Sequence, residues 1–114
     1  GIGASYTYDN YIRGHAGPFE ENLEYVDFTG HILENAEGNF GGWFGWPNLK
    51  MKPKKNYMGF TYNSNQVGEM RVVDLYRREG DKIAENWVLI DHLHFLNCLG
   101  IDLLEINRKK KEII

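Results

Sequence analysis

The stretch that decides the fold reads Met70-Arg-Val-Val-Asp-Leu-Tyr-Arg-Arg-Glu79, then Gly80-Asp81, then Lys82-Ile-Ala-Glu-Asn-Trp-Val-Leu-Ile-Asp91. Two runs rich in β-branched and aromatic residues flank a Gly-Asp pair, which is typical of a two-residue hairpin turn. A turn of this length fixes the register of an unbulged hairpin. The register pairs Glu79 with Lys82, Arg77 with Ala84, Leu75 with Asn86, Val73 with Val88 and Arg71 with Ile90.

The intervening residues share the second face of this hairpin, because side chains alternate across a strand. That face is expected to carry Met70, Val72, Asp74, Tyr76, Arg78, Ile83, Glu85, Trp87, Leu89 and Asp91. Three carboxylates would then stand among aromatic and aliphatic side chains. A face of this composition is a candidate small-molecule pocket.

Composition places the chain among ordinary globular proteins. Its 114 residues suit one domain, with 42% hydrophobic and 25% charged residues. The aromatic share of 14% is high, which suits a curved sheet around a cavity and equally a plain β-rich core. The net charge of −3 gives no case for nucleic acid, so the basic runs at 50–55 and 108–111 are interpreted as solvated edges.

Targeting and redox signals are weak. The longest apolar runs are too short to span a bilayer and no signal-peptide pattern is present, so no membrane association is expected. Cys98 is the single cysteine, which rules out an intramolecular disulfide and favours a reducing, cytoplasmic location.

The N-terminal segment predicts helix. Thr7 is a candidate N-cap for a helix that begins at Tyr8, with Asp9 in its first turn, and that runs to about Leu23. Glycines at 14 and 17 and a proline at 18 interrupt the pattern. We expect two short helical pieces or one kinked helix, packed through Tyr11, Ile12, Phe19 and Leu23.

The rest of the chain predicts mostly strands. Expected elements are a strand at 25–37, a glycine-interrupted aromatic strand at 39–47 with a bulge or a close backbone approach, an edge segment at 49–53, and a strand at 57–62. A turn at 63–65 precedes the hairpin, and a helical turn at 92–99 ends at Gly100. The sequence thus predicts an α+β fold with the helix laid on one face of a curved antiparallel sheet. A single domain covers 1–104, and 105–114 is expected to be a frayed charged tail.

The acids of the hairpin are the sharpest candidate site. Asp74, Glu85 and Asp91 would raise one another's pKa by desolvation and repulsion. One carboxylate could then take a proton from an acidic C–H, while a protonated neighbour or Tyr76 donates to the developing oxyanion. Two alternatives remain: the acids pair with arginines such as Arg13, Arg71 or Arg77, or their face is a dimer interface.

Other candidates would wall or reach the pocket. The wall set comprises Tyr76, Trp87, Trp43, Trp46, Met70 and Leu89, although the tryptophans between glycines equally suit core packing. His15, His31 and His94 are further candidates, with a solvated or core histidine as the alternative. No metal motif or phosphate-binding loop is present, so no metal or cofactor is expected, and Cys98 is interpreted as a small buried hydrophobe.

Several of these segments resemble the SnoaL-like polyketide cyclase group of the nuclear transport factor 2-like superfamily. They are Phe40-Gly-Gly-Trp-Phe-Gly-Trp-Pro47, the hairpin Gly68–Asp91 with its Arg-Glu-Gly-Asp-Lys-Ile-Ala-Glu-Asn-Trp core, and His94-Phe-Leu-Asn-Cys-Leu-Gly100. His15 and Pro18-Phe19 are similar to the helix before the sheet. The likeness spans roughly residues 3–104.

The resemblance implies a cystatin-like cone of curved antiparallel sheet around a deep apolar pocket, often dimeric through the outer sheet face. Because little precedes the helix at Tyr8, the N-terminal helices that close the cone are expected to be largely missing. Related cyclases and isomerases use an acid on a carbon acid without cofactor or metal. Asp91 would match the acid/base residue and Asp74 its partner.

The sequence therefore predicts a homodimeric protein that binds a small apolar or polycyclic carbonyl compound, as a cofactor-independent cyclase or isomerase. The rival prediction is a non-catalytic ligand-binding or dimerisation module of the same fold, in which the acids are structural.

Overall fold

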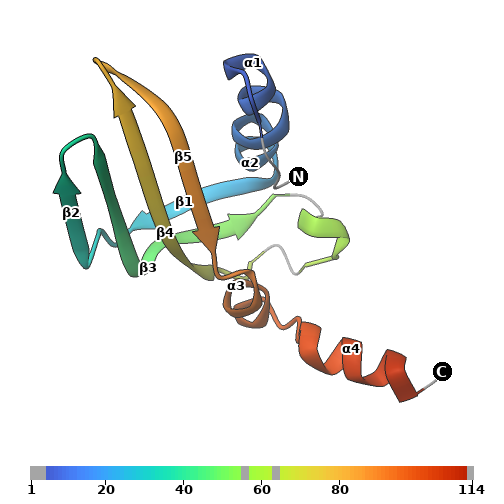
Figure 1. Ribbon diagram of the computed structural model, residues 1–114. Helices are drawn as coiled ribbons and strands as arrows, with labels where there is room; N and C mark the ends of the chain where they lie inside the picture. Colours follow the sequence, from blue (N-terminus) through green and yellow to red (C-terminus); the bar gives the residue numbers. More distant parts are fainter. Residues whose placement is uncertain (1–4, 55–56, 63–64, 113–114) are drawn as a thin grey trace.

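The computed structural model describes residues 5–54, 57–62 and 65–112, and its architecture is α+β. The elements are α1 (Tyr8–Tyr11), a π-helical turn (Ile12–Ala16), α2 (Gly17–Asn22), β1 (Leu23–Phe28), β2 (Leu33–Glu37), β3 (Phe40–Pro53), a 3-10 turn (Tyr57–Gly59), β4 (Gly68–Glu79), β5 (Lys82–Ile90), α3 (His92–Cys98) and α4 (Leu103–Glu112). One curved antiparallel sheet has the order β1-β3-β4-β5, and β2 also pairs with β3. The N-terminal helix stands beside this sheet (Figure 1).

The N-terminal helix is one continuous rod rather than two separate pieces. Thr7 caps it as predicted, since its Oγ1 accepts a hydrogen bond from the Asn10 backbone N–H at 3.2 Å. The π-helical turn contains Gly14 and continues directly into α2, so the helix is not broken. A Cβ at Gly17 would lie 2.8 Å from the carbonyl oxygen of Ile12, which is too close. The helical backbone at this position therefore requires a residue without a side chain. The helix ends where Leu23 becomes extended.

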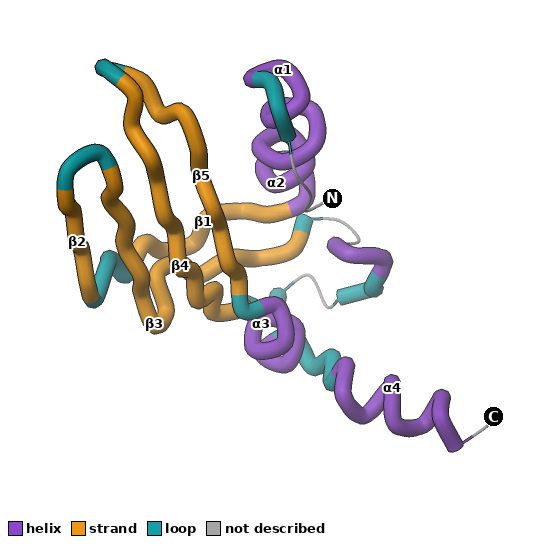
Figure 2. The backbone as a smooth tube through the Cα atoms, viewed as in Figure 1, coloured by secondary structure: helices purple, strands orange, loops and turns teal. Residues whose placement is uncertain are grey.

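Three of the strand predictions are wrong. The expected strand at 25–37 is two strands, because the chain turns at Gly30, whose φ is +95°. Residues 49–53 are not an edge, since they pair with β1 on one side and β4 on the other. Tyr57–Gly59 is a 3-10 turn with a buried Tyr57 instead of a strand. The turn expected at 63–65 falls partly outside the described residues. Figure 2 gives the course of these segments.

The C-terminal predictions are mixed. A helix (α3) followed by Gly100 in the left-handed region, with φ +81°, confirms the expected helical turn and its end. The expected frayed tail is wrong, because residues 103–112 form α4. Ion pairs from Glu105 to Arg108 and Lys109, three and four residues on, stabilise that exposed helix.

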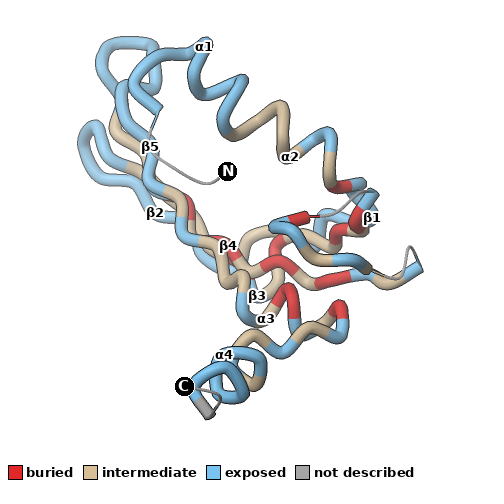
Figure 3. The backbone as a smooth tube through the Cα atoms, turned by 90° about the vertical axis from the view of Figure 1, so that its right-hand side faces the viewer, coloured by how far each residue is buried: buried red, intermediate tan, exposed pale blue. Residues whose placement is uncertain are grey.

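The core lies at one end of the sheet, where α3 packs on β4 (Figure 3). Phe95 of α3 is fully buried, and a Cβ at Gly68 would come within 2.4 Å of its ring. The buried set comprises Leu23, Met51, Tyr57, Met70, Val72, Phe95 and Leu99. The halves of β4 and β5 nearer the hairpin turn lie outside this core, so side chains on both of their faces can form sites.

A buried amide stabilises the bend in β3, where the pairing with β4 shifts between Gly45 and Leu49. Asn48 is fully buried, and its Oδ1 accepts a hydrogen bond from the Val72 backbone N–H at 2.8 Å. A Cβ at Gly45 would lie 2.4 Å from the Asn48 side chain. The predicted bulge and close approach in this glycine-rich stretch are both confirmed.

Stability should fall in mild acid because of His92. Its Nε2 lies 2.9 Å from the hydroxyl of Tyr57, and burial lowers the pKa of His92 below its ordinary 6.5. The folded protein then binds a proton at His92 less readily than the unfolded chain does. The contribution of neutral His92 to the free energy of unfolding is therefore complete above pH ~6.5, and it is lost as the pH falls toward the pKa of His92 in the folded protein. Urea unfolding at stepped pH should show the decline.

The matched variant for this test is His92→Gln, which cannot titrate. Its free energy of unfolding should be lower throughout but should depend less on pH between about 6.5 and 5. An unchanged acid slope in this variant would contradict the assignment to His92.

Candidate functional site

A bulge in the β4–β5 hairpin decides which residues form the site. The predicted register holds at the turn, where Glu79 faces Lys82, and the pairing then shifts between Arg77 and Arg78. Beyond the shift Asp74 faces Val88 and Tyr76 faces Asn86. The bulge shifts the pairing of β5 with β4 by one residue. Each β5 residue beyond the bulge therefore lies on the sheet face opposite to the one predicted.

The predicted set of residues on one hairpin face is therefore wrong for β5 beyond the bulge. Asp74 and Tyr76 lie on the inner face, toward the N-terminal helix, together with Asn86 and Val88. Trp87 and Leu89 stand on the outer face with Leu75 and Val73. Asp91 is two residues after Leu89, which places it on the outer side as well, and it does not line the inner cavity.

The inner face forms one wall of a cavity of about 940 Å³. The opposite wall is the N-terminal helix, which also contributes Tyr11, His15 and Phe19. Six of the predicted site residues line it: His15, Trp43, Met70, Asp74, Tyr76 and Glu85. The other predicted residues do not: His31, Trp46, Trp87, Leu89, Asp91 and His94. His31 nevertheless stacks on Trp43, with ring centroids 4.2 Å apart.

Asp74 is the polar centre of the cavity. The residue is 8% exposed, and its Oδ1 accepts a hydrogen bond from the Asn86 amide. The same Asn86 amide donates to the carbonyl oxygen of Leu75 at 3.0 Å, which fixes its orientation. Burial and the hydrogen bond to Asp74 raise the pKa of Tyr76, while a hydrogen bond from Trp43 acts in the opposite sense. Tyr76 therefore remains a phenol that can donate a proton.

Apart from His15, the aromatic row on the helix was not predicted to line the cavity. Ring contacts run from Tyr8 to Tyr11, His15 and Phe19 and then to Tyr25 of β1, with centroids 5.4–6.4 Å apart. All of these side chains line the cavity. The signal was present in the sequence, because positions 8, 11, 15 and 19 recur at the three- and four-residue spacing of one helical face.

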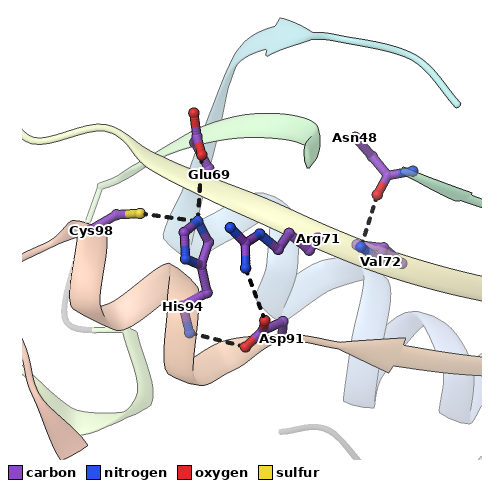
Figure 4. Close-up of polar contacts among 7 residues, drawn as sticks. All are labelled: Asn48, Glu69, Arg71, Val72, Asp91, His94 and Cys98. Carbon is purple, nitrogen blue, oxygen red and sulfur yellow. Dashed lines mark hydrogen bonds and ion pairs between the residues drawn. The ribbon is translucent and has the colours of Figure 1, made fainter. Parts of the chain in front are cut away.

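The other two predicted acids are structural in their contacts. Asp91 caps α3 by accepting a hydrogen bond from the His94 backbone N–H at 3.0 Å, and its Oδ2 lies 3.6 Å from Arg71 Nη1 (Figure 4). Arg71 stacks over Trp46 at 4.4 Å. A hydrogen bond from Arg77 at 2.8 Å lowers the pKa of Glu85. Arginine pairing, one of the two alternatives for these acids, thus holds for both of them.

The fold and cavity define an α+β protein with one curved antiparallel sheet and a helix facing its inner side. Comparisons with family models, with curated proteins and with solved structures find no match. Within the described part of the chain, every helix is too short or too polar to cross a bilayer.

Proposed function

We propose that this protein binds a small apolar carbonyl compound in the inner cavity and acts on it through Asp74 and Tyr76, without a cofactor. One observation carries the proposal. Among the described residues, Asp74 is the only buried carboxylate, and it stands beside a phenol on the wall of a cavity of about 940 Å³. Cavities of this size accommodate small organic ligands.

The chemistry follows from the two neighbouring groups. In the free protein the phenol proton of Tyr76 is hydrogen-bonded to Asp74. When the substrate binds, Tyr76 donates this proton in a hydrogen bond to the carbonyl oxygen, on which the negative charge develops. Asp74, released from that hydrogen bond, takes the proton from the carbon next to the carbonyl. Return of the proton to another carbon gives an isomer. Attack of the enolate on a second carbonyl of the same molecule closes a ring, and the alkoxide formed in this step takes back the proton from Asp74. Asn86 holds Asp74 in place for either outcome.

A relationship to the SnoaL-like cyclases of the nuclear transport factor 2-like superfamily is part of this proposal. The curved antiparallel sheet and the helix facing its inner side support it. In this chain, however, the acid/base role falls to Asp74 rather than Asp91, because the hairpin bulge turns Asp91 away from the cavity. We keep a cytoplasmic location as part of the same proposal.

A matched ligand pair tests carbonyl recognition. β-Tetralone and its parent hydrocarbon tetralin differ by one carbonyl group. The wild-type protein should bind the ketone about 3- to 10-fold more tightly, which is the usual range for one hydrogen bond. Tyr76→Phe should abolish this preference in calorimetric titrations, whereas Tyr62→Phe, outside the cavity lining, should retain it. An equal preference in wild type and Tyr76→Phe would refute the role of Tyr76.

The second candidate function is a non-catalytic dimerisation module. The outer sheet face exposes five large apolar side chains: Leu33, Phe40, Leu75, Trp87 and Leu89. A shallow groove of about 400 Å³ lies on the same face. Acids and arginines both border this face. Because the two copies in a two-fold dimer present the same surface to each other, a border that carries both charges can complement itself, so a second copy of this chain suits the face.

Sedimentation equilibrium tests this association. Leu89 is 60% exposed, so Leu89→Glu should leave the protomer folded yet convert a wild-type dimer into a monomer. A wild type that stays monomeric up to high concentration would contradict the homodimer.

A further inference from the structure

Three side chains with metal-binding atoms converge between α3 and β4, outside the cavity. His94 and Cys98 are four residues apart on α3 and therefore share one helix face. Glu69 reaches them from the start of β4 (Figure 4). One nitrogen, His94 Nε2, lies 3.4 Å from Glu69 Oε2 and 3.5 Å from Cys98 Sγ.

These separations fit a tetrahedral metal ion. Zinc bond lengths of about 2.0–2.3 Å place neighbouring ligand atoms about 3.3–3.6 Å apart. The ligand atoms of all three residues lie within 4.8 Å of one another. The separation of 3.4 Å between His94 Nε2 and Glu69 Oε2 is longer than the usual N–H···O hydrogen bond. A single ring N–H also cannot point at both the carboxylate and the sulfur.

The helix that carries two of the ligands is held firmly. Asp91 caps its first turn, and Phe95 and Leu96 between the ligands are fully buried. Rigid support of this kind keeps a metal site preorganised. The three ligating side chains themselves are only partly buried, so an ion can enter from solvent.

We propose that Glu69, His94 and Cys98 bind one zinc-type divalent transition-metal ion. Thiolate, imidazole and carboxylate together favour zinc over magnesium or calcium, which prefer oxygen ligands alone. Three protein ligands leave the fourth tetrahedral position to water. The sequence shows no metal motif for this set, because Glu69 is distant in sequence from His94 and Cys98.

Cobalt(II) is the probe for this site, used with the untagged, reduced, chelator-treated full chain. One equivalent should produce the visible bands of tetrahedral cobalt and a thiolate charge-transfer band, and one equivalent of zinc should remove both. Cys98→Ser should lose the charge-transfer band. Cys98→Ser and Glu69→Gln should each weaken zinc binding at least ~10-fold, since even residues that only orient a ligand are worth about 10- to 100-fold.

Controls separate this site from non-specific binding. Glu34→Gln, at an exposed position on β2, should bind like wild type. If Cys98→Ser does not fold, Glu69→Gln carries the test, because the Glu69 side chain is 42% exposed. A cobalt spectrum without a thiolate band, or unchanged affinity in Glu69→Gln, would overturn the proposal. None of the three ligands lines the cavity, so the result is independent of the proposed carbonyl chemistry.

Discussion

Asp74→Asn is expected to slow deuterium exchange at the carbon next to the carbonyl of bound β-tetralone by about 10²- to 10⁴-fold, the usual contribution of a positioned acid/base group. The amide keeps the shape of the carboxylate and can still accept the hydrogen bond from Asn86, but it cannot take a proton at neutral pH. Proton NMR in deuterated buffer measures the rate directly.

An acid outside the cavity provides the matched control for this exchange experiment. Asp91→Asn removes a charge that is paired with Arg71 and does not line the cavity, so it should retain the wild-type exchange rate. Loss of exchange in Asp91→Asn with full exchange in Asp74→Asn would instead assign the chemistry to Asp91 and contradict the role proposed for Asp74.

Asn48→Ala is expected to lower the free energy of unfolding by about 2–4 kcal/mol. The substitution removes the acceptor of the buried Val72 N–H, and an unsatisfied buried donor costs about 1–3 kcal/mol. Loss of packing against Gly45 adds to this cost. Urea unfolding measures the difference.

Asn35→Ala provides the comparison, because Asn35 is exposed on β2. Its effect should stay within about 0.5 kcal/mol. Equal stabilities of the Asn48→Ala variant and the wild type would show that the bend in β3 does not depend on the buried amide.

Local signals predicted much of the fold. The Thr7 cap, the Gly80-Asp81 turn and the helix stop at Gly100 all depend on residues close together in sequence, and all are confirmed. Residues 49–53 were assigned to an edge because of their lysines and proline. Their true neighbours, β1 and β4, are set by long-range pairing.

The candidate site was harder to predict, because its composition depends on one residue of register. Asp74, Tyr76 and Trp43 were identified correctly as cavity residues. Trp87, Leu89 and Asp91 were assigned to the wrong face, since neither strand carries a local signal for the bulge near Arg77. Glu69 joins His94 and Cys98 only through the packing of α3 on β4.

The most direct test of the proposed carbonyl site is the pattern of NMR contacts between β-tetralone and labelled methyl groups. We expect nuclear Overhauser effects from the ligand to Val72, Val88 and Ile90, which line the inner cavity. Contacts confined to Leu75 and Leu89 would place the ligand on the outer face. That result, or no contact at all, would contradict a carbonyl-binding site at Asp74 and Tyr76.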